Sequence, residues 1–265
     1  MHLNPKAIPK KTIGLALSGG GARGIAHLGV LKAFDELGIK PDLISGSSAG
    51  AVVGAFYAAG YEPDQIYETL TKTNVFRLLR PAISKLSFLK LDRTSHVFNK
   101  FLPHKFEQLE IPLIITATEI NQGVTHYFST GELIKCIHAS CSMPIIFEPI
   151  KIGDKVYVDG GVMDNLPVDP LIAAQMDVII GVHVNPKNED FKAMSIRNIA
   201  ERSFQLALSY NVKERKPKCD IYVEPQDLKG IKLFEISKAK IIFKAGYDAV
   251  MNDKEMILKK LIPET

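Results

Sequence analysis

The segment Gly46 to Gly50, which reads Gly-Ser-Ser-Ala-Gly, contains the residues of the chain that are best suited to chemistry. Residues 42–45 before it predict a short strand, and residues 51–59 after it predict a helix that Gly60 can close. A serine on such a sharp strand-to-helix turn has a strained backbone, and the turn holds its hydroxyl clear of the sheet edge. A Cβ at Gly46 or Gly50 would clash with the turn. The segment therefore predicts Ser48 as a nucleophile, and an ordinary serine in a glycine-rich turn is the alternative.

A glycine-rich loop follows the first predicted strand, residues 12–17, and leads into a helix that Gly38 can end. Consecutive glycines let several backbone N–H groups point the same way, at a helix N-terminus whose dipole favours negative charge. The oxygen of a tetrahedral intermediate needs such donors at about 3 Å, and each can be worth about 3 kcal/mol. The loop therefore predicts an oxyanion hole that is built from backbone N–H groups.

The same loop has a competing interpretation, because Gly19, Gly21 and Gly24 fit the dinucleotide-binding pattern G-x-G-x-x-G. That pattern also requires an acidic residue at the far end of the second strand, whereas Asp42 stands at its near end. Nucleotide binding is therefore the weaker expectation. Arg23 has two open roles: it steadies the loop or meets a phosphate, or it forms an ion pair at the surface.

An aspartate, Asp159, stands at the end of a predicted hairpin strand and is followed by Gly160 and Gly161. A nucleophilic serine needs a base within hydrogen-bonding reach. A carboxylate with a pKa of about 4 is a weak base, but it can act if the serine proton moves as the attack proceeds. A turn aspartate is the alternative, because Asp-Gly is a common turn pair. The histidine of a triad would be His183, but its place in a predicted buried strand favours a core or rim role.

Alternating strands and helices must position these groups, which predicts an α/β fold. The two glycine-containing loops follow adjacent parallel strands, so both emerge at the carboxyl edge of the sheet. Strands are predicted at residues 12–17, 42–45, 111–120, 124–128, 178–184 and 220–223. Residues 111–128 predict one hairpin, and residues 151–158 predict a second, short hairpin with its turn at 153–155. Helices are predicted at 25–37, 51–59, 61–73, 130–139, 166–176, 195–216, 238–250 and 253–261.

The composition, with 46% hydrophobic and 23% charged residues, fits one large α/β domain or two small ones, and we expect a single domain over residues 1–265. A net charge of +4 is too small an excess to indicate nucleic acid. Cys136, Cys141 and Cys219 lack metal-ligand spacing, so we expect buried thiols in a reducing compartment and no metal. No targeting segment is evident and no stretch approaches the roughly 18 apolar residues of a membrane span. A cytoplasmic protein is expected, with a peripheral position at the membrane as the alternative.

Residues 72–105 differ in character from the rest of the chain, because eight lysines and arginines alternate there with many apolar residues and one acidic residue, Asp92. A basic and apolar segment beside an active-site edge predicts a lid or a membrane-facing surface. Ordinary covering helices with solvated lysines are the alternative.

Four segments of the chain, in this order, resemble the bacterial patatin-like phospholipases: residues 19–24 (Gly-Gly-Gly-Ala-Arg-Gly), 46–50, 139–149 and 159–167. The resemblance covers residues 12–185 and implies a three-layer α/β/α sandwich with a mainly parallel central sheet. It implies a catalytic dyad without histidine, in which Ser48 is the nucleophile and Asp159 the base. It also implies that Gly19, Gly20 and Gly21 donate N–H groups to the oxyanion. The implied substrates are acyl esters of lipids, cleaved through a covalent acyl-enzyme with no metal or cofactor.

Other functions remain open from the sequence. One is acyl transfer with a histidine base, and another is a lipid-binding or regulatory module that has the same fold but no catalysis. Residues 186–265 show no chemistry, and we expect them to form the closing helices and last strand and to offer a face for a homodimer.

Overall fold

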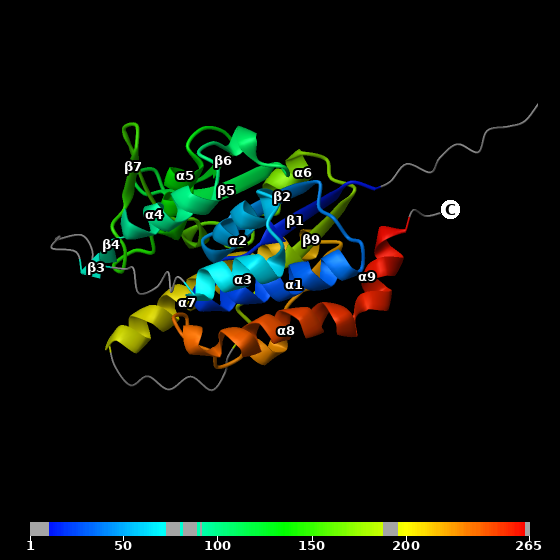
Figure 1. Cartoon of the computed structure of the whole chain (residues 1–265). Helices are drawn as coiled ribbons and strands as arrows, with labels where there is room; N and C mark the ends of the chain where they lie inside the picture. Colours follow the sequence, from blue (N-terminus) through cyan, green and yellow to red (C-terminus); the bar gives the residue numbers. More distant parts are fainter. Residues whose placement is uncertain (1–10, 73–79, 82–88, 91, 188–195, 263–265) are drawn as a thin grey trace, which may run out of the picture.

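The computed structural model describes residues 11–72, 80–81, 89–90, 92–187 and 196–262 (Figure 1). Its centre is an eight-stranded sheet in the order β10-β9-β1-β2-β5-β8-β7, and β6 also pairs with β5. The strands are β1 (Ile13–Leu17), β2 (Leu43–Ser47), β5 (Leu113–Glu119), β6 (Val124–Phe128), β7 (Ile150–Ile152), β8 (Lys155–Asp159), β9 (Val178–Val182) and β10 (Ile221–Val223).

The sheet is mainly parallel, as the sequence predicts. Strands β10, β9, β1, β2 and β5 run in one direction, and the two predicted hairpins supply the antiparallel strands β6, β7 and β8. Strands β1, β2 and β9 are buried along their whole length. Such continuous burial is typical of parallel strands that are covered by helices on both faces.

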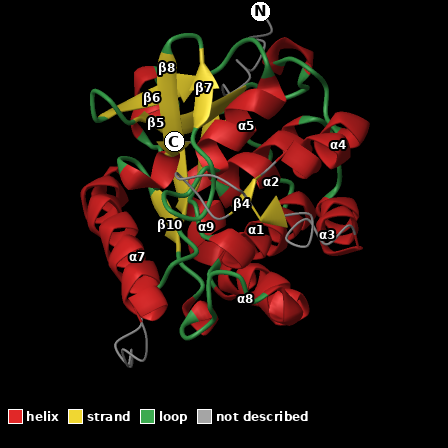
Figure 2. Cartoon of the chain, turned by 90° about the vertical axis from the view of Figure 1, so that its left-hand side faces the viewer, coloured by secondary structure: helices red, strands yellow, loops and turns green. Residues whose placement is uncertain are grey.

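Helices cover both faces of the sheet and complete a three-layer fold (Figure 2). They are α1 (Ile25–Glu36), α2 (Ala49–Ala58), α3 (Pro63–Lys72), α4 (Asp92–Phe101), α5 (Leu133–Cys141), α6 (Asp169–Ala173), α7 (Ile196–Arg215), α8 (Ala239–Asn252) and α9 (Lys254–Leu261). Two adjacent residues of β2 lie on opposite faces of the sheet, because successive side chains of a strand point in opposite directions. Ile44 joins the core of α1, α2 and α8, whereas Leu43 joins the core that includes Leu171 of α6 and Val212 of α7.

Helix α8 packs directly on α1, and two glycines make the close approach possible. A Cβ on Gly29 of α1 would lie 2.0 Å from the carbonyl oxygen of Phe243, and a Cβ on Gly246 of α8 would lie 1.9 Å from that of Ala26. Neither backbone could stay in place beside such an atom. The C-terminal helix α8 therefore lies directly against α1.

Two predictions differ from the structure or fall outside it. The helix predicted over residues 166–176 is shorter, because α6 begins at Asp169 and has Pro170 in its first turn, where the missing N–H needs no partner. Of the segment 72–105, the structure describes Lys72, the short antiparallel pair β3 (Arg80–Pro81) and β4 (Leu89–Lys90), and everything from Asp92 onward. The lid or membrane-facing prediction depends mostly on residues that lie outside the described ones. No helix in the described part of the chain is both long and apolar enough to span a bilayer.

Candidate active site

Ser48 occupies the turn between β2 and α2 with an unusual backbone conformation, φ 50° and ψ −117°. The flanking glycines are required by close contacts. A Cβ on Gly46 would lie 2.7 Å from the carbonyl carbon of Gly50, and a Cβ on Gly50 would lie 2.2 Å from the carbonyl oxygen of Leu17. The predicted strand-to-helix turn at Ser48 is therefore present, with its backbone in the strained region of φ/ψ space.

Asp159 ends β8 and lies across β5 from the serine turn. Strand β5 pairs Thr116 with Ser47 of β2 and Ala117 with Asp159 of β8. The Asp159 carboxylate is buried, accepts a hydrogen bond from the Gly161 N–H at 2.8 Å and interacts by a side-chain hydrogen bond with Ser48. The structure thus brings together the serine and the aspartate that the sequence singled out, 111 positions apart in the numbering.

Burial raises the pKa of Asp159 from its ordinary 3.8 to about 6, while the hydrogen bonds from Gly161 and Ser48 act in the opposite direction. A carboxylate with this pKa is ionised at neutral pH and is a better proton acceptor than a solvated aspartate. Gly160 allows the approach of the strands, because a Cβ there would lie 2.3 Å from Oγ1 of Thr116. The site therefore has a nucleophile candidate with a base candidate beside it.

In the glycine loop after β1, the backbone groups up to the Gly19 carbonyl form hydrogen bonds with other segments of the protein. The Ser18 N–H donates to the carbonyl of Val182 at 3.0 Å, and the Gly19 N–H donates to the carbonyl of Asn165 at 3.2 Å. The Gly19 carbonyl accepts from Nδ2 of Asn185 at 2.6 Å. In this structure the Gly19 N–H is therefore already engaged by the Asn165 carbonyl.

The next two amides of the loop differ from that of Gly19. Among the residues that the structure describes, Gly20 N–H and Gly21 N–H donate to no backbone or side-chain acceptor. Gly21 begins a short 3-10 helix, Gly21–Gly24, whose first N–H groups have no partner within the helix. Gly21 has φ 56°, and a Cβ there would lie 2.4 Å from the carbonyl oxygen of Leu233. Both amides thus lack an acceptor among the described residues, and Gly21 also lines the pocket beside Ser48.

The remaining residues of the loop pack into the protein. Arg23 is buried, with an exposed fraction of 5%, which excludes the surface ion pair considered from the sequence. Gly24 lies against the residue after Ser48, since a Cβ on Gly24 would lie 2.4 Å from that of Ala49. The glycine loop and the serine turn are therefore in direct contact.

Two buried histidines, His27 and His183, have structural partners close to the glycine loop and the end of β9. Nε2 of His27 lies 2.8 Å from the carbonyl oxygen of Ser18, and burial lowers the pKa of His27 to about 4, so the ring is neutral and donates this bond. His183 is buried just beyond β9, with Nδ1 2.8 Å from Oε1 of Glu224 and 3.0 Å from the hydroxyl of Tyr222. This agrees with the core or rim role that the sequence favours for His183.

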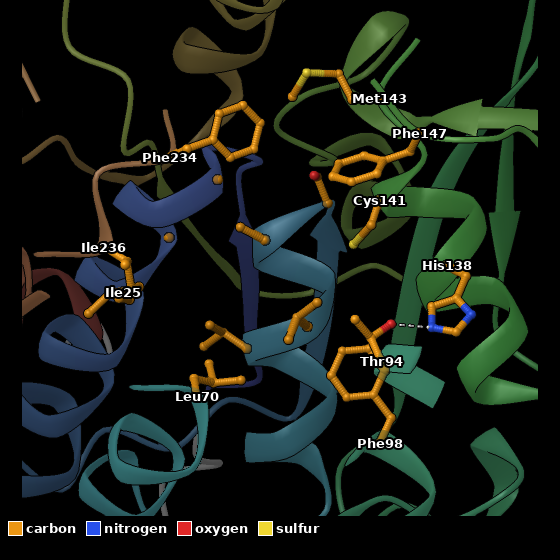
Figure 3. Close-up of a pocket in the computed structure, with 16 residues that line it drawn as sticks. Ile25, Leu70, Thr94, Phe98, His138, Cys141, Met143, Phe147, Phe234 and Ile236 are labelled. Carbon is orange, nitrogen blue, oxygen red and sulfur yellow. Dashed lines mark hydrogen bonds between the residues drawn. The ribbon is translucent and has the colours of Figure 1, made fainter. Parts of the chain in front are cut away.

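An apolar pocket opens beside Ser48, with a cavity volume of about 120 Å³ (Figure 3). Its polar contributions come from Ser48, Thr94, His138 and Cys141, and burial raises the pKa of the Cys141 thiol well above its usual range. Leu70 and Phe98 lie toward one end of the pocket, and Met143 and Phe147 lie toward the other (Figure 3). The apolar side chains of its wall are Ile25, Val52, Val53, Leu70, Phe98, Met143, Phe147, Phe234 and Ile236. Such a wall suits a hydrocarbon chain.

Sequence reasoning did not single out three polar residues of this site. Ser140 accepts a hydrogen bond from the Ser48 N–H, Asn165 accepts one from Gly19, and Asn185 donates one to Gly19. Asn165 belongs to a segment that carries the family resemblance, and Asn185 follows a buried parallel strand at the same edge as the two glycine loops. Polar residues just beyond such strands are the available signal. In the part of the chain that the structure describes, no group of three or more His, Cys, Asp or Glu side chains could hold a metal ion.

The fold and the site together define a three-layer α/β protein with a serine turn and a glycine loop at the carboxyl edge of its sheet. The chain belongs to the patatin-like phospholipase family, whose family model matches residues 15–172.

Curated relatives extend this result. The chain is 36% identical over 176 residues to an uncharacterized NTE family protein of Mycobacterium tuberculosis, in an alignment that covers 65% of this chain and 49% of that protein. It is 33% identical over 189 residues to the lysophospholipase NTE1 of Saccharomyces cerevisiae, over 68% of this chain and 11% of that protein. The chain thus spans about half the length of the mycobacterial relatives that it matches.

Solved structures show the same fold at low sequence identity. VipD from Legionella pneumophila matches with a TM-score of 0.55 and 15% identity, over 94% of this chain and 68% of that chain. Human GIVD cytosolic phospholipase A2, solved in complex with methyl gamma-linolenyl fluorophosphonate, matches with a TM-score of 0.50 and 12% identity, over 95% of this chain and 59% of that chain.

Proposed function

We propose that this chain is a serine acyl hydrolase of lipids, of the phospholipase A, lysophospholipase or esterase type. The observation that carries the proposal is the side-chain hydrogen bond between the buried Asp159 and Ser48, a residue that lines an apolar pocket. Membership of the patatin-like phospholipase family supports the same class of reaction.

In the proposed reaction Ser48 is the nucleophile and Asp159 the general base. The carboxylate takes the proton of the serine hydroxyl as Oγ attacks the ester carbonyl, and the carbonyl π electrons move onto its oxygen. The tetrahedral intermediate then collapses and expels the alcohol oxygen, which takes the proton from Asp159. Water enters, gives a proton to Asp159 and attacks the acyl-enzyme, so that the fatty acid leaves and Ser48 regains its hydrogen.

The negative oxygen of the intermediate requires donors that are fixed before the reaction. We assign this role to the N–H groups of Gly20 and Gly21, because both lack an acceptor among the described residues and both belong to the loop that contacts the serine turn. Gly19 supports the loop instead, through its bond to Asn165. No metal or cofactor enters these steps.

The acyl chain is the part of the substrate that the pocket fits. A hydrocarbon tail in contact with Val52, Leu70 and Phe98 would leave water and gain about 0.8 kcal/mol for each buried methylene. The yeast relative is named a lysophospholipase, which places a single-chain phospholipid among the substrates to be tested first.

A fluorophosphonate probe tests the proposal most directly, because it labels only an activated serine. The wild-type chain should be labelled and should hydrolyse a short p-nitrophenyl ester. Ser48→Ala should lose both reactions, and Asp159→Asn should lose hydrolysis while remaining folded. Turnover retained by Ser48→Ala would reject the assignment. A folded wild type that is never labelled would instead favour a lipid-binding or regulatory module.

Acyl transfer with a histidine base has less support. The Nδ1 atom of His183 already pairs with Glu224 and Tyr222, and His138 pairs through Nε2 with Thr94. If His183→Ala lost all turnover while keeping its fold, the proposal would have to include a histidine base.

A further inference from the structure

Asn185 is a buried polar residue outside the matched family model, which ends at residue 172. It follows β9 and reaches back to the glycine loop, where its Nδ2 donates to the Gly19 carbonyl at 2.6 Å. Only the amide nitrogen, Nδ2, can donate to a carbonyl oxygen. In the flipped orientation Oδ1 would face the Gly19 carbonyl oxygen, and two acceptors cannot form a hydrogen bond.

This hydrogen bond continues the pairing of β1 and β9 beyond the ends of both strands. Within the sheet the two strands pair up to Leu17 and Val182, and the Ser18 N–H still donates to the Val182 carbonyl. Further along, side chains replace the backbone ladder, because the Val184 N–H donates to Oγ of Ser18 at 3.1 Å and Asn185 then binds the Gly19 carbonyl. The glycine loop is therefore fixed to the segment after β9 at successive residues.

The contact with the Gly19 carbonyl determines the direction of the next amide. The carbonyl of Gly19 and the N–H of Gly20 belong to one planar peptide group, and in a trans peptide these two bonds point in opposite directions. No peptide bond in the described residues is cis. Since Asn185 holds the carbonyl on its own side, the Gly20 N–H points away from Asn185.

The two sides of this peptide have different neighbours. A Cβ on Gly20 would lie 2.5 Å from Cγ2 of Val184 and 3.2 Å from Oδ1 of Asn185, whereas a Cβ on Gly19 would lie 3.1 Å from Cβ of Ser48. Asn185 therefore stands behind the loop, and it does not line the pocket beside Ser48.

We propose that Asn185 is a positioning residue of the reaction, which orients the Gly19–Gly20 peptide so that the Gly20 N–H is fixed as an oxyanion donor. The inference rests on the proposed function and adds a residue to it. Without the bond from Asn185 the peptide can rotate and lose the donor direction, while the pocket that binds the acyl chain stays unchanged. The loss should therefore fall on kcat and spare KM.

Asn185→Leu tests this role, because leucine has a similar shape and no donor. With rates expressed per labelled active site, we expect kcat for a short p-nitrophenyl ester and the rate of fluorophosphonate labelling to fall about 10- to 100-fold. KM should stay within about threefold of wild type, since the substrate pocket is untouched. Ser45→Ala is the matched control, because it removes another buried side-chain hydrogen bond to a carbonyl, that of Pro167, at 2.5 Å. This control should lower the melting temperature and keep kcat.

Equal per-site rates in Asn185→Leu and wild type, with only the melting temperature lowered, would overturn the proposal. Should Asn185→Leu fail to fold, Asn185→Ala is measured in the same way, and the wild type supplies an independent result by NMR. On reaction with the fluorophosphonate, the Gly20 amide proton should move downfield as it donates to the phosphonyl oxygen, and that of Gly19 should not. An unmoved Gly20 resonance also overturns the proposal. Failure of the proposed function itself is distinct, because the wild type would then not be labelled at all.

Discussion

The backbone N–H of Ser48 donates a hydrogen bond to the side-chain oxygen of Ser140, 2.8 Å away. Helix α5 thus holds the serine turn from outside the β2–α2 unit. A residue with the φ of Ser48 stores on the order of 1–3 kcal/mol of strain, so it persists only where its surroundings fix it. Ser140 is fully buried and is one of the groups that does so.

Removing this acceptor should affect both stability and rate. We expect Ser140→Ala to lower the free energy of unfolding by about 1–3 kcal/mol, because it leaves a buried N–H without a partner. The rate of fluorophosphonate labelling should fall with it, since the turn then relaxes. Ser142→Ala is the control, because Ser142 directly follows α5 and its hydroxyl donates to the His138 carbonyl, one turn back. Urea unfolding and labelling kinetics would contradict this expectation if the two variants behaved alike.

The pH dependence of hydrolysis should report the Asp159 carboxylate. Burial raises its pKa to about 6, and only the ionised form can accept the proton of Ser48. We therefore expect kcat/KM to be constant near pH 8 and to fall tenfold per pH unit below about pH 6. A profile that stays flat down to pH 4.5 would mean that another group, or none, acts as the base.

The same carboxylate should destabilise the folded protein at neutral pH. Its pKa rises on folding from 3.8 to about 6, so the folded state binds the proton more tightly than the unfolded state. The contribution of this tighter proton binding to the free energy of unfolding is complete below pH 3.8 and is lost as the pH rises through 6. Replacing the ionised group with a neutral amide should then stabilise the protein by roughly 3 kcal/mol at pH 8.

Asp159→Asn is the variant that measures this effect. Its free energy of unfolding should exceed that of wild type at pH 8, and the difference should shrink as the pH falls from 7 toward 4. Asp154→Asn, at an exposed hairpin turn, is the control and should show no such gain. If Asp159→Asn is less stable than wild type at pH 8, the hydrogen bonds of the carboxylate stabilise the fold by more free energy than the burial of its charge costs.

Much of the fold follows from the sequence because its signals are local. Gly153 in one hairpin and Gly123 in another both have positive φ, as their turn positions suggest. The serine turn and the glycine loop are likewise visible in a short window, because close backbone contacts force glycine at set spacings. Their meeting also follows from the rule that parallel strands end at a common edge.

The hydrogen bonds of the loop could not be derived in this way. The engagement of Gly19 with Asn165 and Asn185 joins residues more than 140 positions apart, and no local pattern specifies it. The length of α6 was also missed, because apolar residues 166–168 continue the helical pattern while their backbone is irregular. Side-chain contacts between distant segments thus decide which amides remain free for a substrate.

The length of the acyl chain should depend on the pocket end at Leu70. Leu70→Trp adds volume there, so kcat/KM for a long-chain ester should fall by about tenfold, because filling a packed space displaces the tail. A butyrate ester should react within about threefold of wild type, since a four-carbon chain needs less of the pocket. Ile172→Trp, at an exposed position on α6, is the control and should alter neither rate. Equal losses for both esters would show that Leu70 lies outside the path of the chain.

We expect Gly19 to tolerate a methyl side chain only when the side chain of Asn165 is shortened. A Cβ on Gly19 would lie 2.6 Å from Oδ1 of Asn165, a buried oxygen with no hydrogen-bond partner among the described residues. Gly19→Ala should therefore lower the labelling rate about tenfold or more, because the loop must move. Asn165→Ala removes the obstructing atom, so the labelling rate of the double variant should recover at least threefold relative to Gly19→Ala, as expected for two residues in contact.

Gly24→Ala is the matched control, because its Cβ would meet Ala49 at 2.4 Å and not Asn165. Its defect should therefore persist in the Asn165→Ala background. Equal recovery for Gly19→Ala and Gly24→Ala would mean that Asn165→Ala loosens the whole loop rather than relieving one contact.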